Sequence, residues 1–387
     1  MSALESGRFG YPPVAEQFWV RQAEVATELS GDLALERLMP YVGRLSDLFT
    51  TERPEKTFPD YFAEQGLLAG YGVFFLPQSF TRTSFALSYA MDFRGWRPPT
   101  DRARILDLGS GPGSCGVSVA HRLLADGARR VSLHALDKSP SALVALENFA
   151  ESVLGEKADV STRAGDASRP AAWPEETFDV IVAGFVLNEL KELDADGLMR
   201  WVTELKRRLH PEGLLIILEP ALRVTSERLQ RLSDRVAAEG LLTRLGPDLD
   251  ALPCPQLAQG LHWTHEARRW TAPVSTEFVN RKLHRDLREV RFSFALFSNQ
   301  VTPPVDPAAV RVVSDVQMIK GMLRFIGIQQ GALQTVEVPT RGLSKHAIKL
   351  LAETFERGDI IAHAQPPSPR VRLSGVPDLR IIYSVRA

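Results

Sequence analysis

Apolar and polar residues follow two different periods along the centre of the chain. Short apolar runs at 105–108, 131–136, 178–184 and 214–218 are typical of strands buried in a parallel sheet, and residues 160–164 read as a further short strand. Between them, apolar residues recur every three or four positions, which is the spacing of an amphipathic helix. The pattern therefore predicts an α/β fold with a doubly wound, Rossmann-like parallel sheet and a ligand site at the carboxyl ends of its strands.

The flanking segments have other patterns. Residues 1–100 show helical spacing and predict a helical N-terminal region, while residues 101–300 hold the strand-and-helix core. An irregular stretch near 243–275 reads as a loop insertion in that core. Residues 301–387 contain short alternating runs and a helical stretch at 344–355, which predict a small β-rich C-terminal extension. We expect three consecutive segments.

A glycine-rich turn follows the first apolar run. Asp107 lies in that run, and Gly109, Ser110, Gly111 and Gly113 then give the spacing G-x-G-x-G. Glycine allows positive φ and removes the Cβ that would keep a ligand away, and backbone N–H groups there can bind a polar ligand group. The NAD fingerprint reads G-x-G-x-x-G, so this spacing favours a different nucleoside. A tight turn without a ligand is the alternative.

Two more acids follow the next two strands. Asp137 ends the second apolar run and precedes Lys138, and Asp166 follows the short third strand beside Ala167. The carboxyl ends of neighbouring parallel strands meet at one edge of a sheet, where an acid can accept hydrogen bonds from two ribose hydroxyls. Acids after three successive strands favour a nucleoside-binding edge over a surface turn.

The acid followed by G-x-G-x-G resembles the first motif of class I S-adenosylmethionine-dependent methyltransferases. The resemblance implies that Asp107 and the glycine loop hold the methionine end of the cofactor and that Asp137 holds the ribose. It also implies that Asp166 accepts a hydrogen bond from the adenine amino group, with the Ala167 backbone against the ring. Ser110 and Lys138 are further cofactor-binding candidates.

The fourth apolar run leads to Asn188 and Glu189, the polar residues of an apolar segment. In the methyltransferases that this chain resembles, the segment forms the substrate-side loop. The two side chains could orient a substrate or accept a proton there, or could cap the next helix. No Asn/Asp-Pro-Pro-aromatic signature follows the strand, which disfavours a base-amino methyltransferase of that type. Cys115 and Cys254 lack the setting of a covalent thiolate mechanism.

Composition narrows the class of protein. Of the 387 residues, 44% are hydrophobic and 24% charged, which is ordinary for a globular protein. Neither a basic-then-apolar leader nor a run of membrane-spanning length is evident, and two cysteines suit a reducing compartment, so we expect a cytoplasmic protein. Residues 200–387 contain 27 Lys and Arg against 19 Asp and Glu, a hint of a nucleic-acid-facing side.

Several weak motifs in the same order resemble the Rsm-type ribosomal small-subunit methyltransferase-like family of bacteria and mitochondria. They are the glycine loop, the Pro-Cys-Pro segment at 253–255, Trp263-Thr264-His265, residues 290–294, residues 311–333 and Gly358-Asp359. The resemblance spans roughly residues 60–360. It implies ribosomal RNA or the assembling small ribosomal subunit as partner.

The resemblance to this family also suggests a metal site, but the chain lacks most of the cysteines that would bind the metal. Many members hold an iron–sulfur cluster with several cysteines around the Pro-Cys-Pro segment, but only Cys254 matches, and Thr264 stands where another cysteine would be. Such clusters usually need four cysteine ligands, so we expect none. Cys254, His262 and His265 could still contribute to a zinc site, or the histidines could simply be polar surface. We predict no bound metal.

A basic stretch follows this region. Arg281, Lys282, Arg285 and Arg288 would share one face of a helix and could contact phosphates of ribosomal RNA. A solvated helix face is the alternative. Together the residues predict an S-adenosylmethionine-dependent methyltransferase acting on ribosomal RNA or the assembling small subunit. A non-catalytic assembly factor that keeps the fold, and a small-molecule methyltransferase, remain the alternatives, and the sequence leaves the oligomeric state open.

Overall fold

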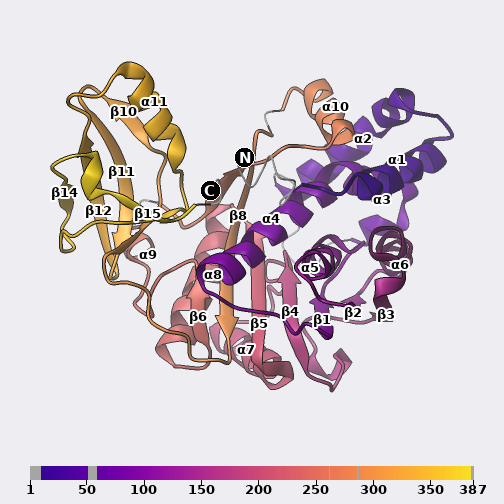
Figure 1. Ribbon diagram of the computed structural model, residues 1–387. Helices are drawn as coiled ribbons and strands as arrows, with labels where there is room; N and C mark the ends of the chain where they lie inside the picture. The colour runs from indigo at the N-terminus through magenta and orange to yellow at the C-terminus, as the bar shows by residue number, and fades with distance from the viewer. Residues whose placement is uncertain (1–9, 51–58, 261, 286, 385–387) are drawn as a thin grey trace. The chain divides into compact units, whose positions relative to one another are not determined.

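The computed structural model describes residues 10–50, 59–260, 262–285 and 287–384 (Figure 1). The chain forms two compact units, each made of stretches that are separate in the sequence. The α/β unit holds residues 9–219 and 269–290, and the β-rich unit is made mainly of residues 220–268 and 291–387. Whether the three consecutive segments expected from the sequence fold independently stays a prediction.

The α/β unit is organised around five parallel strands. They are β1 (Arg102–Leu108), β2 (Arg130–Asp137), β3 (Ala158–Ala164), β4 (Phe178–Gly184) and β5 (Leu209–Pro220). Their spatial order is β3-β2-β1-β4-β5, and every neighbouring pair is parallel. The order reverses between β1 and β4, which is where doubly wound sheets form their binding crevice. This confirms the predicted fold class.

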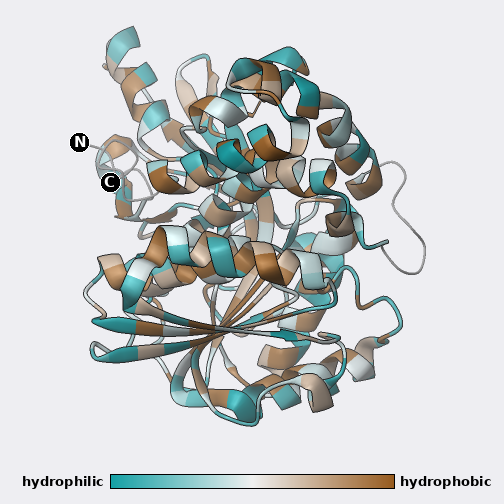
Figure 2. Ribbon diagram, turned by 90° about the vertical axis from the view of Figure 1, so that its right-hand side faces the viewer, coloured by the Kyte–Doolittle hydropathy of each residue, from teal (hydrophilic) through white to brown (hydrophobic). Residues whose placement is uncertain are grey.

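Helices connect these strands and begin at clear sequence signals. They are α5 (Ser114–Ala125), α6 (Pro140–Leu154) and α7 (Ala195–Arg208), and Figure 2 shows helices on both faces of the strands. The Ser139 hydroxyl caps α6 by accepting the Ala142 N–H at 3.3 Å, and the Asp194 carboxylate caps α7 by accepting the Gly197 N–H at 2.7 Å. Side chains that precede these two helices therefore fix where α6 and α7 begin.

The N-terminal helices and α10, which comes much later in the sequence, complete the α/β unit. They are α1 (Pro13–Thr27), α2 (Asp32–Phe49), α3 (Gln65–Gly70), α4 (Leu76–Ser88) and α10 (Val274–Lys282), with short helical turns at Tyr61–Ala63, Tyr71–Phe75 and Tyr89–Phe93. Trp19 of α1 is buried with its ring centroid 5.6 Å from that of Phe149 on α6. The Ser275 N–H of α10 donates to Glu16 Oε1 at 2.7 Å. The N-terminal helices thus share a core with the sheet.

The β-rich unit contains a second sheet in the order β14-β12-β11-β9-β13-β15, with β10 beside β11. Its strands are β9 (Ala309–Val312), β10 (Gln317–Ile319), β11 (Met322–Gln329), β12 (Ala332–Pro339), β13 (Ile360–Ala362), β14 (Arg370–Arg372) and β15 (Arg380–Tyr383). Helix α11 (Lys345–Thr354) packs on a core that includes Phe325 and Phe355. Gln330 and Gly331 join β11 to β12 with φ of 49° and 69°, as a tight hairpin requires.

The rest of the β-rich unit precedes this sheet in sequence. It comprises α8 (Arg223–Ala238), β6 (Thr243–Gly246), α9 (Pro255–Gln259), β7 (Glu266–Arg269) and β8 (Glu289–Ser298). Strand β8 is antiparallel to β6 and also pairs with β7. Arg311 on β9 forms buried ion pairs with Asp248 at 3.1 Å and Glu266 at 2.6 Å. No helix in the described ranges has the length and apolar character needed to cross a membrane.

Candidate functional site

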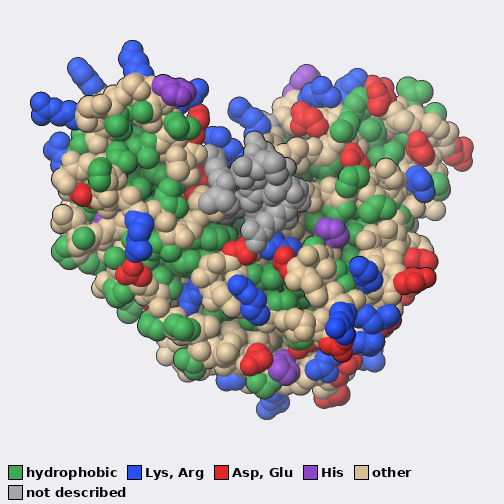
Figure 3. All heavy atoms as spheres, viewed as in Figure 1, with side chains coloured by type: hydrophobic (Ala, Val, Ile, Leu, Met, Phe, Trp, Pro, Cys, Tyr) green, Lys and Arg blue, Asp and Glu red, His purple; other side chains and the backbone are tan. Residues whose placement is uncertain are grey.

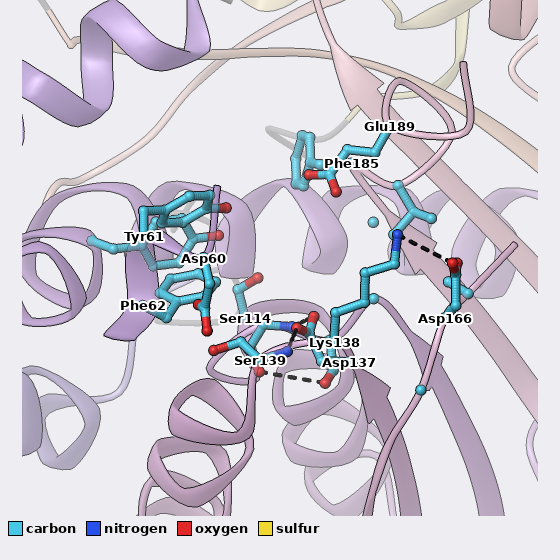
Figure 4. A pocket seen from close by; sticks show the side chains of 18 of the residues that line it. Asp60, Tyr61, Phe62, Ser114, Asp137, Lys138, Ser139, Asp166, Phe185 and Glu189 are labelled. Carbon is cyan, nitrogen blue, oxygen red and sulfur yellow. Dashed lines mark hydrogen bonds and ion pairs between the residues drawn. The ribbon is translucent and has the colours of Figure 1, made fainter. Parts of the chain in front are cut away.

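A pocket opens at the carboxyl ends of β1 to β4 in the α/β unit (Figure 4). Its walls are the glycine turn, the ends of β2 and β3, the segment after β4, and residues 59–62 with Tyr71 from the N-terminal helices. The pocket therefore lies where the sheet topology predicts a ligand.

The glycine turn wraps around the end of β2. The N–H groups of Gly109 and Ser110 donate to the Leu136 carbonyl at 2.7 and 3.1 Å, which fixes the turn beside that strand. Gly109 has φ of 66°, and a Cβ there would lie 2.2 Å from Cγ2 of Val186. Glycine is therefore required at this position for both backbone and packing reasons.

Asp137 is an acid of the pocket that two backbone N–H groups hold in place. Its Oδ2 accepts the Gly111 N–H at 2.7 Å, and its Oδ1 accepts the Ser139 N–H at 2.9 Å. Burial raises the pKa of Asp137, while these two N–H groups act in the opposite direction. Each carboxylate oxygen keeps a second acceptor position. The side chain is thus held in one orientation and can still accept hydrogen bonds from two hydroxyl groups of a ligand.

Asp107 lies behind the glycine turn and does not line the pocket. It is 1% exposed, and its Oδ2 accepts the Gly116 N–H on the first turn of α5 at 2.7 Å. Burial raises the pKa of Asp107 to about 7, against the effect of the Gly116 N–H. Gly113, also outside the pocket lining, precedes α5 with φ of 95°. Both residues support the turn from behind.

Asp166 and Lys138 form the opposite wall of the pocket. Lys138 Nζ lies 3.3 Å from Asp166 Oδ2, and the Ser168 N–H donates to Asp166 Oδ1 at 2.8 Å. Burial acts to raise the pKa of Asp166, but the Ser168 hydrogen bonds and the Lys138 charge together lower it. The Ala167 carbonyl accepts the indole N–H of Trp201 at 2.9 Å, which anchors this loop to α7. An ionised carboxylate therefore faces the pocket.

Asn188 and Glu189 lie in the segment after β4, and only Glu189 lines the pocket. Asn188 is buried; its backbone N–H donates to Glu219 Oε1 at 3.2 Å, and its amide donates to the Phe185 carbonyl. The alternative that these residues cap the next helix is wrong, because α7 begins at Ala195 and Asp194 caps it. Asn188 instead fixes the loop through these hydrogen bonds, and Glu189 lines the pocket.

Aromatic side chains that the sequence did not single out form another wall. Tyr61 and Phe62 have ring centroids 4.3 Å apart, and Phe62 packs edge-on to Tyr71 at 5.1 Å. Burial raises the pKa of Tyr61 well above its ordinary value, and the charge of Glu189 adds to the effect. The one signal in the sequence that could have indicated this wall is the adjacent pair Tyr61-Phe62. Across the pocket, Phe185 has φ of 64°, which is strained for a residue with a side chain.

The prediction that Arg281, Lys282, Arg285 and Arg288 share one face of a helix is wrong. Helix α10 ends at Lys282, and His284 adopts φ of 51°. The His284 N–H then bonds the Arg281 carbonyl at 3.1 Å and the Arg285 N–H bonds the Asn280 carbonyl at 3.0 Å, which together form a Schellman ending. Arg285 and Arg288 lie beyond the helix and share no face with it.

These basic side chains also have separate surroundings. Arg281 Nε lies 3.8 Å from Glu277 Oε1, and Lys282 Nζ lies 2.5 Å from Glu36 Oε1. The Arg285 guanidinium lies 5.6 Å from the Phe74 ring centroid, and the Arg288 carbonyl accepts the Trp270 N–H at 3.4 Å. Whether any of these four residues contacts RNA stays a prediction.

The residues considered for a metal have other partners in the β-rich unit. Cys254 Sγ lies 3.2 Å from Thr264 Oγ1. His265 Nδ1 lies 3.1 Å from the Trp263 carbonyl oxygen, and its Nε2 lies 3.2 Å from Arg357 Nη1. His262 is exposed. Within the described ranges, no group of three His, Cys, Asp or Glu side chains is arranged to hold a metal ion.

Comparison with known proteins agrees with the fold. Residues 106–215 match the family model described as "Methyltransferase domain". No curated protein matches the chain.

Solved structures with a similar arrangement include a ribosomal protein L11 methylase from Lactobacillus delbrueckii subsp. bulgaricus (22% identity, 43% of this chain and 71% of that one, TM-score 0.29). Others are a magnesium protoporphyrin IX methyltransferase from Synechocystis PCC 6803 with bound SAH (11%, 62% and 97%, 0.36) and an rRNA methylase from Streptococcus thermophilus (12%, 55% and 95%, 0.29). At these values they say nothing of the substrate. By the family model, residues 106–215 form a methyltransferase domain in this chain.

Proposed function

We propose that this chain binds S-adenosylmethionine in the pocket at the ends of β1 to β4 and transfers its methyl group to a nucleophile. The observation that carries the proposal is Asp137, whose carboxylate is fixed by the Gly111 and Ser139 N–H groups at the mouth of the glycine turn. A carboxylate held in this way suits two neighbouring hydroxyls, which only the ribose of such a cofactor supplies.

The other pocket residues fit the remaining parts of the cofactor. Asp166, kept ionised by its Ser168 and Lys138 neighbours, would accept a hydrogen bond from the adenine amino group. The glycine turn removes side chains where the amino-acid part must approach the backbone, and a Cβ at Gly109 would already collide with Val186. Asp107 would act indirectly, because it fixes the start of α5 and does not face the pocket.

The cofactor supplies an electrophilic methyl group on a sulfonium sulfur. Its transfer depends chiefly on in-line alignment of the nucleophile, which the protein provides by positioning. Phe185 and Glu189 line the pocket beyond the end of β4, where an acceptor would enter. Glu189 is exposed, so its carboxylate can take a proton from the acceptor and pass it to solvent. Asn188 would keep this loop in place.

We propose ribosomal RNA or the assembling small ribosomal subunit as the substrate. The Rsm-type resemblance of the sequence and the excess of basic residues in its C-terminal half support this choice. Lys320, Arg341, Lys345 and Lys349 are exposed on and around α11 and β10, and Figure 3 shows basic side chains projecting where these elements lie. Such cations position a phosphate backbone without reading its bases.

Calorimetric titration with S-adenosylhomocysteine tests the cofactor site. Asp137→Asn should lose at least tenfold in affinity, because hydrogen bonds to a charged group contribute about 1.5–3 kcal/mol each. Asp159→Asn is the matched control: Asp159 is an acid on the neighbouring strand β3, paired with Arg130 and outside the pocket. Equal affinities of wild type and Asp137→Asn would refute the assignment.

Incubation with radiolabelled S-adenosylmethionine then separates the substrate classes. Label in RNA of small ribosomal subunits supports the proposed substrate, whereas label in low-molecular-weight products would favour the small-molecule alternative, to which the aromatic wall of Tyr61, Phe62 and Tyr71 is suited. Failure of the folded wild-type protein to bind the cofactor would leave the non-catalytic assembly factor as the better explanation.

A further inference from the structure

Arg82 on α4 is a cation with no acidic partner among the described residues. Its Nη2 donates to Gln78 Oε1 on the same helix at 3.1 Å, and its Cζ lies 5.7 Å from the Phe185 ring centroid. Its Nε is buried and has no hydrogen-bond partner in the part of the chain that the structure describes. Burial lowers the pKa of the guanidinium to about 10, and the charges that act on it come from Tyr71 and Cys115, not from a carboxylate.

The Arg82 side chain is half-buried, and its Nε is withdrawn from water. Removing a charge from water is unfavourable unless an opposite charge and hydrogen bonds compensate for it. Buried donors are nearly always satisfied in folded proteins, so the open Nε needs an explanation. A ligand that brings an anion would supply both missing partners.

Arg82 lies directly behind the wall of the cofactor pocket. Two of its neighbours, Phe185 and Tyr71, line the pocket. Burial raises the pKa of the Tyr71 hydroxyl, and the nearby Ser79 and Ser114 side chains act to lower it. Ser114, the first residue of α5, also lines the pocket. In Figure 4 it lies on the far side of Lys138 from Asp166, so this end is separate from the one assigned to adenine.

The pocket itself offers little positive charge to an anion. Lys138 is the one Lys or Arg among the described residues that line it, and its ammonium group is paired with Asp166. S-adenosylmethionine carries an α-carboxylate on its amino-acid part, at the opposite end of the molecule from adenine. With adenine and ribose at Asp166 and Asp137, this carboxylate is directed to the Ser114 end.

We propose that Arg82 binds the α-carboxylate of the cofactor, with Phe185 holding the guanidinium in place from one side. This proposal rests on the proposed function. It makes Arg82 the residue that distinguishes cofactors with an amino-acid part from adenosine derivatives without one. An anionic acceptor, such as an RNA phosphate, is the other source of the same chemistry, and the experiment separates the two.

The test compares two ligands by calorimetry. S-adenosylhomocysteine has the amino-acid part, whereas 5′-methylthioadenosine has the same adenosine and a sulfur atom but no carboxylate. Arg82→Gln should weaken binding of the first ligand at least tenfold and leave the second within twofold of wild type. Arg82→Lys should recover part of the loss. Arg200→Gln, at an exposed position on α7, is the control.

Other outcomes overturn the proposal. Equal weakening of both ligands would mean that Arg82 only supports the fold of the pocket. Unchanged affinity for both, with weaker binding of small-subunit RNA, would assign Arg82 to the acceptor. If wild type binds neither ligand, the proposed function itself fails, a result that differs from loss of the carboxylate preference alone.

Discussion

Asp107→Asn should change how the stability of the α/β unit depends on pH. The Asp107 carboxyl group is buried behind the glycine turn, and its pKa is raised from the ordinary 3.8 to about 7. Between these two values the unfolded chain has lost this proton while the folded chain keeps it. The free energy of unfolding of the wild type therefore falls as pH rises through this range. Asparagine keeps an oxygen for the Gly116 N–H and cannot ionise.

The size of the effect follows from the two pKa values of Asp107. The difference between 3.8 and about 7 corresponds to about 4 kcal/mol in full, of which roughly 2–3 kcal/mol develops between pH 5 and pH 8. The stability of Asp107→Asn relative to wild type should rise by that amount across the window. Urea unfolding followed by circular dichroism at several pH values measures the difference. Parallel curves for the two proteins would refute the burial argument.

Two further predictions concern the pocket. Gly109→Ala should destabilise the protein by more than the roughly 1–2 kcal/mol expected for a left-handed backbone alone, because its Cβ would also meet Val186, and thermal melting should show a larger loss than in Gly31→Ala, where φ is 57° and no atom lies within 4 Å. A loss no larger than that of the control would contradict the steric argument. Asp166→Ala should remove the preference for S-adenosylhomocysteine over its inosine analogue, which lacks the amino group; a retained preference in competition binding would disprove adenine recognition by Asp166.

Local signals in the sequence were enough to predict the sheet and the glycine turn. Strands β1, β2, β4 and β5 contain apolar runs, and α6 and α7 begin directly after Ser139 and Asp194, whose side chains cap them. The edge where Asp137 and Asp166 meet follows from the parallel order of the strands. These features depend on neighbours in the sequence or on general rules of topology, so they can be predicted from the sequence alone.

Features that depend on tertiary contacts could not be predicted in the same way. Asp107 has the position expected of a ligand-binding acid, but its orientation is set by the Gly116 N–H on α5. The end of α10 was hidden because His284, not a glycine, takes the left-handed conformation there. Tyr61 and Tyr71 reach the pocket only because the N-terminal helices fold onto the sheet.

The path of the chain between its two compact units limits how this protein can be dissected. The chain passes from one unit to the other at residues 219/220, 268/269 and 290/291, and α10 returns to the α/β unit between the last two crossings. No single truncation therefore separates the two units, and a stop before residue 269 would delete the helix that bonds Glu16 of α1. A stand-alone methyltransferase fragment would need α10 supplied as a second chain or through a circularly permuted gene.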